Sequence, residues 1–201
     1  MTAKPLAGRA ALVLGVERAA GRAAAIALGE AGASVALCTL SRETAAKFAA
    51  NSAANEFWAF GGKTVVVETD GDEASISEAI GSATAQLGAV SVLVWHAATP
   101  GVRDALAGLR SDPAIVVLVG DDDALEAAPA LLAWTRELAD AGLRANAVVG
   151  SRGVLDVAGP VLKEHHAAEA ADLASAVVYL ASDASAAVEG AVVVVAGSGP
   201  T

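Results

Sequence analysis

Aromatic residues and cysteine are scarce in this chain of 201 residues. Aromatic types account for 3% of the sequence, which argues against the base-stacking surfaces that hold single-stranded nucleic acid. The single cysteine, Cys38, excludes an internal disulfide, and its place in an apolar run predicts a buried thiol. A cytoplasmic location fits this use of cysteine best.

Long apolar segments and positive charge are also lacking. No stretch reaches membrane-spanning length, and Met1–Pro5 lacks the apolar core of a secretory signal, so we expect neither feature. The formal net charge of -10 argues against binding to nucleic acid or to an anionic membrane, because both partners are themselves negative. A nucleotide can still bind at a locally positive spot.

Small apolar residues are abundant instead: hydrophobic types make up 55% of the sequence and charged types 18%. This length and composition suffice for one domain with a large core, so we expect a single domain over residues 1–201. Apolar runs alternate with helical segments along the chain. The alternation predicts an α/β fold, with a doubly wound and mostly parallel sheet of about seven strands.

The first strand, helix and second strand organise the rest of the chain. Residues 11–14 are predicted as a buried strand, 15–21 as a turn, 22–30 as a helix and 34–40 as the next strand. In a parallel βαβ unit the helix N-terminus lies over the carboxyl end of the first strand, where amide groups favour a phosphate. The stretch predicts a dinucleotide site, with a purely structural glycine turn as the alternative.

The turn Gly15-Val-Glu-Arg-Ala19-Ala-Gly21 resembles the Gly-x3-Gly-x-Gly turn of the short-chain dehydrogenase/reductase family, with Ala19 in place of the middle glycine. Residues 171–183 resemble the family's last helix, and residues 189–197 resemble its last strand. The resemblance covers nearly the whole chain and implies a Rossmann-like domain. It also implies a nicotinamide cofactor in contact with Gly15, Ala19 and Gly21.

Further cofactor contacts follow from the same resemblance. Asp70 comes after the third predicted strand, where the family has an aspartate that holds the adenine amino group; capping a helix over 73–86 is its alternative role. Ala97 lies in the loop after the fourth strand, where the family has Asn-Asn-Ala-Gly and this chain has Trp95-His96-Ala97-Ala98. Whether Trp95 fills the cofactor pocket stays open at this point.

The second strand's end indicates which dinucleotide would bind. Residues 37–41 offer no acidic group for a ribose diol, and Arg18 and Arg42 can meet a 2′-phosphate, so NADP is favoured over NAD. The methyl group of Ala19 and the charge of Glu17 oppose binding of the pyrophosphate.

The family's catalytic Asn-Ser-Tyr-Lys tetrad has no counterpart. Residues 99–113 hold only a short predicted helix, over 102–109, and no tetrad asparagine can be placed there. The fifth predicted strand, 114–119, runs into Gly120-Asp121-Asp122-Asp123 and contains no serine.

The helix after the fifth strand lacks the tetrad's other two members. Aligning Trp134-Thr135-Arg136 with the family's Leu-Thr-Arg puts Ala124 at the tyrosine position and Ala128 at the lysine position, and neither performs acid-base chemistry. The only tyrosine, Tyr179, lies in the last predicted helix. In the helix after the fifth strand, Pro129 suits the first turn and not the interior.

Two residues are catalytic candidates. His96 and Asp121 each follow a strand at the edge where such sheets bind ligands, so either is a candidate proton donor. The alternative role for His96 is structural: its side chain fills a gap left by residues that the family has in this loop and this chain lacks.

No metal site is expected. Asp121–Asp123 could bind a divalent ion, but adjacent positions cannot all face one point, and Asp123 fits a helix cap better. His165, His166 and Glu169 have helical spacing without a further ligand.

Two local features complete the predictions. Ser41–Thr44 resembles a capping box that starts a helix running to about Ala54. Phe57, Trp58 and Phe60 are expected to pack a helix on the sheet, with a ligand platform as the alternative.

Together these features predict a diverged family member without the usual hydride-transfer chemistry. It would act as a structural or regulatory partner of a full-length paralogue, or as a small-ligand binder. The alternative is an NADP-dependent oxidoreductase, or a non-redox lyase or isomerase, that uses non-standard residues. We expect a homodimer through the C-terminal helix and strand, or a hetero-oligomer with a full-length family member.

Overall fold

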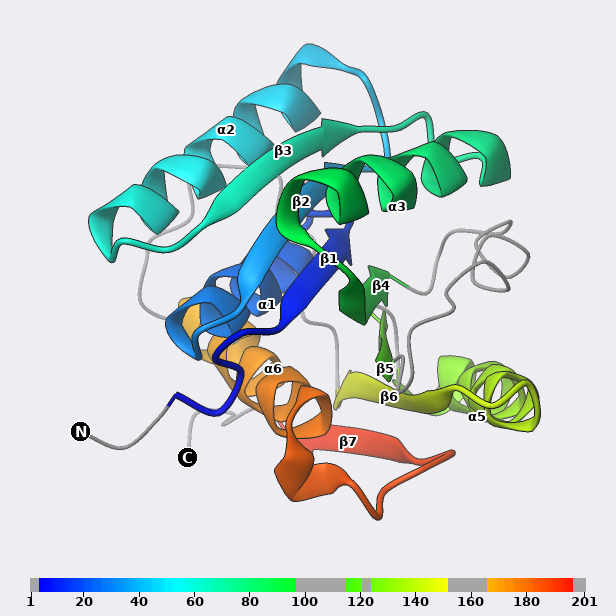
Figure 1. Cartoon of the computed structure of the whole chain (residues 1–201). Coiled ribbons are helices and arrows are strands. Elements are labelled where there is room, and N and C mark those ends of the chain that lie inside the picture. The colour runs from blue at the N-terminus through cyan, green and yellow to red at the C-terminus, as the bar shows by residue number, and fades with distance from the viewer. Residues whose placement is uncertain (1–3, 97–114, 121–123, 152–165, 197–201) are drawn as a thin grey trace.

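A computed structural model of the chain describes residues 4–96, 115–120, 124–151 and 166–196 (Figure 1). Its seven described strands form one sheet in the order β3-β2-β1-β4-β5-β6-β7, and every neighbouring pair is parallel. The strands are β1 Ala10–Leu14, β2 Ser34–Thr39, β3 Thr64–Glu68, β4 Val90–His96, β5 Ile115–Gly120, β6 Arg144–Ser151 and β7 Val192–Ala196. The predicted doubly wound parallel sheet is confirmed.

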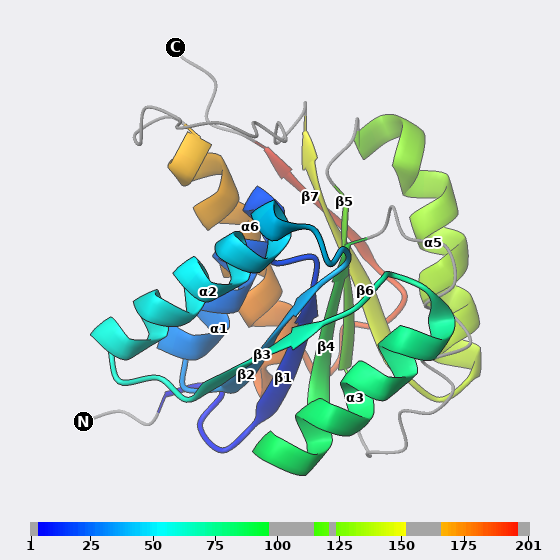
Figure 2. The same cartoon turned by 90° about the horizontal axis from the view of Figure 1, so that it is seen from above.

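Helices cover both faces of this sheet (Figure 2). One face carries α1, α2 and α6, and the other carries α3 and α5. The helices are α1 Ala19–Glu30, α2 Thr44–Ala59, α3 Glu73–Leu87, α5 Ala124–Asp140 and α6 His166–Ala181, followed by the short 3-10 helix η1 Asp183–Ser185. None of the helices in the described ranges is long and apolar enough to cross a bilayer.

The central strands are apolar throughout because both of their faces are buried. In β1, Ala11 and Val13 pack toward α1 and α6, whereas Leu12 and Leu14 pack toward α3 and α5. All five residues of β1 are buried. A continuous apolar run is therefore the expected sequence of a strand in the middle of such a sheet.

Several helix ends differ from the sequence-based predictions. Helix α1 begins at Ala19, inside the predicted turn, and α6 begins at His166 instead of Ala171. The capping-box prediction at Ser41 is wrong, because Glu43 precedes α2 and no side chain caps that helix. Helix α2 then continues to Ala59, five residues beyond the predicted end.

The aromatic residues near the end of α2 have different environments. Phe57 is fully buried, and its ring lies 5.0 Å from that of Phe60. A Cβ added at Gly29 of α1 would come within 2.4 Å of the Phe57 ring, so the small residue makes room for the aromatic one. The predicted packing role is confirmed for Phe57, but it is wrong for Trp58, which is 82% exposed.

Pro129 lies inside α5 and not in its first turn, so that prediction is wrong. The helix starts at Ala124, earlier than the position of the proline alone indicated. A proline inside a helix has no amide hydrogen for the i→i−4 bond, which leaves one bond of the second turn unmade.

Candidate functional site

The strand order reverses between β1 and β4, which lie side by side at the centre of the sheet. In open parallel α/β sheets, ligands bind beyond the carboxyl ends of the strands at such a reversal. The turn that follows β1 lies there, and it is tied to β2. The backbone amides of Gly15 and Val16 both donate to the Cys38 carbonyl, at 2.9 and 3.2 Å.

Both glycines of this turn are required by the backbone. Gly15 has φ of +90°, a conformation that residues with a side chain rarely adopt. A Cβ at Gly21 would lie 2.2 Å from the Gly15 carbonyl oxygen, closer than any real contact. Gly21 therefore lets the start of α1 pack directly on the turn. Their part in binding a cofactor stays a prediction.

The N-terminus of α1 faces this edge of the sheet, and no described side chain caps its first amides. Arg18 is the N-cap residue, no side chain of the described residues accepts a bond from the first turn, and that turn contains no acidic residue. The amides and the helix dipole favour an anion at this position. Ala19 is exposed there, where the family has its middle glycine.

Glu17 is directed toward the end of β2. Its Oε1 accepts a bond of 2.9 Å from the amide of Leu40. Its Oε2 is buried without a hydrogen-bond partner in the described part of the chain. The carboxylate thus stands at the end of β2, a strand that has no acidic residue of its own there. The sequence shows the charge of Glu17 but not its contact with the Leu40 amide.

Cys38 is buried, as predicted. Burial raises the pKa of its thiol to about 12; a hydrogen bond with Thr69 lowers it and the nearby charge of Glu17 raises it. Because only the thiolate is a nucleophile, we expect this buried thiol to be unreactive at neutral pH.

The predicted adenine-binding residue Asp70 forms an ion pair. Arg42 Nε lies 2.9 Å from Asp70 Oδ2, and both side chains are partly exposed. The alternative role of Asp70 as a helix cap is wrong, because Asp72 accepts the cap bond from the Ser75 amide at 2.7 Å. Hydrogen bonds from the Ser75 amide and hydroxyl lower the pKa of Asp72, and the charge of Arg42 lowers it further.

Trp95 packs into the core at the end of β4. Its side chain is buried and stacks on Trp134 of α5, with ring centroids 5.6 Å apart and planes inclined by 10°. Trp95 therefore lies on the sheet face that α3 and α5 cover. This stacked pair, which sequence reasoning missed, has no local sequence signal because its members are far apart in the chain.

The other candidates are only partly described. Ala97 and Asp121 lie outside the described residues, and of His96 only the backbone at the end of β4 is described. Asp121–Asp123 and His165 also lie outside. Among the described residues no group of three His, Cys, Asp or Glu side chains can hold a metal ion.

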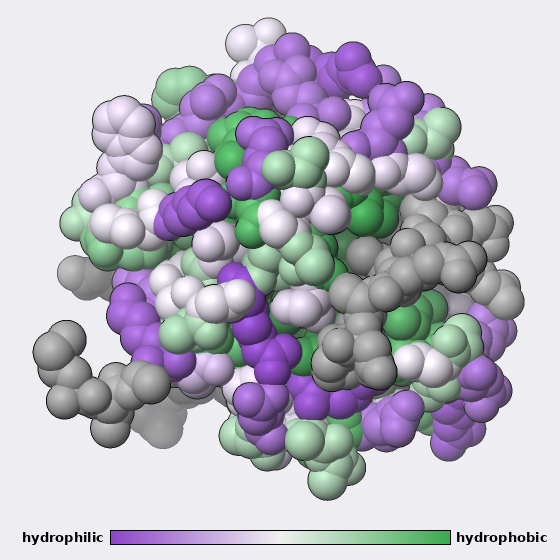
Figure 3. All heavy atoms as spheres, viewed as in Figure 1, coloured by the Kyte–Doolittle hydropathy of each residue, from purple (hydrophilic) through white to green (hydrophobic). Residues whose placement is uncertain are grey.

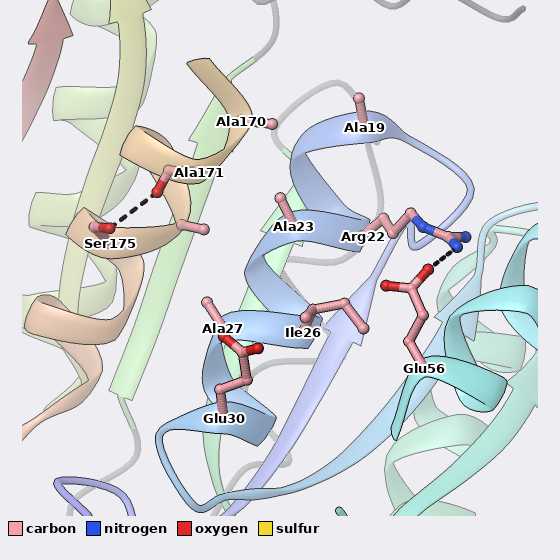
Figure 4. Close-up of a pocket in the computed structure, with 11 residues that line it drawn as sticks. Ala19, Arg22, Ala23, Ile26, Ala27, Glu30, Glu56, Ala170, Ala171 and Ser175 are labelled. Atoms are coloured by element: carbon pink, nitrogen blue, oxygen red, sulfur yellow. Dashed lines mark hydrogen bonds and ion pairs between the residues drawn. The ribbon is translucent and has the colours of Figure 1, made fainter. Parts of the chain in front are cut away.

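A groove of about 470 Å³ lies between α2 and α6, on the surface of α1 that faces away from the sheet (Figure 4). Its floor consists of small residues of α1, including Ala23 and Ala27. At its α2 side, Arg22 pairs with Glu56 and donates to Ser52 Oγ at 3.0 Å and to the Ala49 carbonyl at 3.1 Å. The arginine thus fastens α1 to α2.

The family model described as short chain dehydrogenase matches residues 9–112, just over half of the chain. The chain belongs to the short-chain dehydrogenase/reductase family. The family resemblance stated from the glycine turn, which lies within the matched range, is thereby confirmed. A comparison with curated protein sequences gave no significant match.

Solved structures of short-chain dehydrogenase/reductases have the same fold. Hydroxysteroid dehydrogenase from Escherichia coli is 20% identical with a TM-score of 0.72, and the alignment covers 98% of each chain. A dehydrogenase/reductase from Sinorhizobium meliloti 1021 is 22% identical with a TM-score of 0.70, over 97% of this chain and 96% of that one. A short-chain type dehydrogenase/reductase from Mycobacterium marinum is 19% identical with a TM-score of 0.72, over 98% of each chain.

In this member of the short-chain dehydrogenase/reductase family, the only tyrosine lies far from the helix that follows β5. Tyr179 belongs to α6, which covers one face of the sheet, whereas α5 covers the other. Helix α5 itself contains neither tyrosine nor lysine.

Proposed function

We propose that this chain is a nucleotide-binding member of the short-chain dehydrogenase/reductase family that does not perform the family's hydride transfer. It acts as a structural or regulatory partner of a full-length paralogue, or as a small-ligand binder. The observation that carries the proposal is the composition of α5, the helix in which the family pattern has Tyr-x3-Lys. Without a positioned acid, the barrier to carbonyl reduction rises by several kcal/mol.

The residues after β1 fit the pyrophosphate of a nicotinamide dinucleotide. Gly15 and Gly21 shape the turn, and beyond it lie the first amides of α1, which no side chain of the described residues caps. When bound, the nicotinamide ring supplies the capacity to accept or donate hydride. The chain's own part is to hold the pyrophosphate at α1, against the crowding by the methyl group of Ala19.

The preference between dinucleotides depends on the ribose end of this site. Arg18 and Arg42 support NADP over NAD, because Arg42 is a cation shortly after the end of β2 and Arg18 is a cation at the start of α1. The carboxylate of Glu17, bonded to the Leu40 amide, opposes a 2′-phosphate. We propose NADP as the preferred cofactor.

The C-terminal elements support a dimer. Strand β7 lies at one edge of the sheet and consists of Val192–Ala196, with no charged residue to discourage pairing. Val194 is 56% exposed, and Tyr179 of α6 is 47% exposed. We propose that a second copy, or a full-length paralogue in the cytoplasm, packs on α6 and β7.

Calorimetric titration with NADPH and NADH, together with the native mass of the protein alone and mixed with a paralogue, tests this function. We expect binding of at least one dinucleotide, a dimer or mixed oligomer, and no turnover with a panel of carbonyl substrates. Turnover that a His96→Ala variant abolishes would overturn the non-catalytic assignment and support the oxidoreductase alternative. A monomer that stays separate from every candidate paralogue would count against the partner role.

A further inference from the structure

The loops that follow β2 and β3 are fastened together at the carboxyl edge of the sheet. The hydroxyl of Thr69 donates to the Thr39 carbonyl at 2.6 Å, and Thr69 itself is fully buried. The next turn rests on the same strand end, because a Cβ added at Gly71, whose φ is +78°, would lie 3.1 Å from the Leu40 carbonyl oxygen. These contacts hold Asp70 beside the residues that follow β2.

Arg42 is surrounded by carboxylates in this region. It pairs with Asp70 at 2.9 Å, and its charge also reaches Asp72, the cap of α3. Glu17 is bonded to the amide of Leu40, two residues before Arg42. Hydrophilic side chains gather over these loops, at the upper edge of the molecule in Figure 3. Arg42 is thus a cation already engaged by an acid, in an acidic neighbourhood.

We infer that Asp70 determines how strongly this site discriminates between NADPH and NADH, because it holds Arg42 in an ion pair that a 2′-phosphate must displace. This inference rests on the proposed dinucleotide binding. The 2′-phosphate is the group by which the two cofactors differ, and a guanidinium binds phosphate oxygens in the same forked geometry as it binds a carboxylate. Asp70 engages the guanidinium through Nε, so a 2′-phosphate has to compete with this carboxylate for the charge of Arg42.

The exchange of partners is energetically accessible. Both side chains of the Arg42–Asp70 pair are partly exposed, and exposed pairs contribute little to stability. Releasing Arg42 is therefore a small penalty, but it falls on NADPH alone, since NADH leaves the pair intact. Asp70 becomes a specificity-determining residue even though it carries the charge opposite to that expected of a phosphate site.

The test is calorimetric titration of wild type and Asp70→Asn with NADPH and with NADH at 0.15 M ionic strength, about the physiological value. The variant frees Arg42 and removes a repelling charge, so the ratio of NADPH affinity to NADH affinity should rise about fivefold, the equivalent of a surface ion pair at the upper end of its range. Any loss of an adenine contact at Asp70 affects both cofactors and cancels in this ratio. In an Arg42→Gln background, Asp70→Asn should raise the ratio by clearly less, because only the direct repulsion between Asp70 and the 2′-phosphate is then removed.

A neighbouring ion pair supplies the matched control. Glu68 lies 2.8 Å from Lys47 and is exposed to an extent similar to that of Asp70. Glu68→Gln removes the same charge from the same edge without touching Arg42, so the affinity ratio should stay at its wild-type value. A rise equal to that of Asp70→Asn would show a general electrostatic effect and overturn the inference.

The remaining outcomes separate this inference from the proposed function. If both dinucleotides bind and Asp70→Asn changes both affinities by the same factor, the inference is wrong while dinucleotide binding stands. If neither dinucleotide binds wild type or any variant, dinucleotide binding itself is wrong, and the inference falls with it.

Discussion

Replacing Gly21 with alanine tests the packing of α1 on the glycine turn. The added Cβ would lie 2.2 Å from the Gly15 carbonyl oxygen and 2.8 Å from its carbonyl carbon. An ordinary contact begins at 3.4 Å, so the backbone must separate by roughly 1 Å. The clash involves backbone on both sides, which no rotamer change can relieve. The start of α1 therefore has to move away from β1.

The size of the effect follows from two opposing contributions. Alanine is about 1 kcal/mol more favourable than glycine inside a helix. Overpacking a tight contact destabilises by up to about 3 kcal/mol, so the net loss at Gly21 should be about 2 kcal/mol. In a domain of this size, that corresponds to a fall in melting temperature of about 4 to 8 °C.

Gly81 provides the control for this substitution. It lies inside α3, and an added Cβ there meets no described atom within 4 Å. Gly81→Ala should therefore stabilise the protein by up to about 1 kcal/mol. Urea denaturation followed by circular dichroism measures both variants. A single protein concentration is used, because the proposed dimer makes stability depend on concentration. A Gly21→Ala protein as stable as Gly81→Ala would refute the close approach of α1 to the turn.

Three further predictions concern the core, the thiol and the sheet edge. Phe57→Ala should lower the free energy of unfolding by about 3 to 5 kcal/mol because the ring is fully buried, whereas Phe48→Ala, at a position 76% exposed, should change it little in the same urea assay. Burial raises the pKa of the Cys38 thiol from its ordinary value of 9.0 to about 12, so its contribution to stability is complete below pH 9.0 and is lost as pH rises toward 12. Stability should therefore fall by about 1.4 kcal/mol per pH unit more in wild type than in Cys38→Ala, and equal slopes would contradict the burial of the thiol. Val194→Lys places a charge on β7 and should convert a dimer to monomer in native mass measurements; an unchanged dimer would place the interface elsewhere.

The strands were predictable because a strand buried on both faces needs a continuous apolar run. Residues 10–14 and 34–39 are such runs, and the predicted ends differ from the observed ones by one residue. The glycine turn was also predictable from the sequence, because Gly15 adopts a backbone conformation that suits glycine and there is no space for a side chain at Gly21. Family membership followed from these local signals together with the C-terminal elements.

The ends of the helices were harder to predict, because several neighbouring residues can cap each helix and the local sequence does not decide which one does. Asp70 and Asp72 both precede α3, and each is a suitable cap residue by type. Asp72 caps the helix, because Gly71, the residue after Asp70, has a φ of +78° and cannot begin a helix. Asp70 instead pairs with Arg42, a residue from the loop after another strand. Ser41 likewise has the residue type of a cap, but Glu43 occupies that position in α2.

The sequence by itself determined the α/β class, the positions of the strands, the glycine turn and the absence of tyrosine and lysine from α5, because each is a property of a short continuous stretch. Only the tertiary structure decided that Glu17 is bonded to the end of β2, that Asp70 holds Arg42, and that Trp95 stacks on Trp134. Each of these contacts joins elements that lie apart in the chain. They form only when the parallel sheet brings the carboxyl ends of its strands to one edge and fixes which helix covers which face.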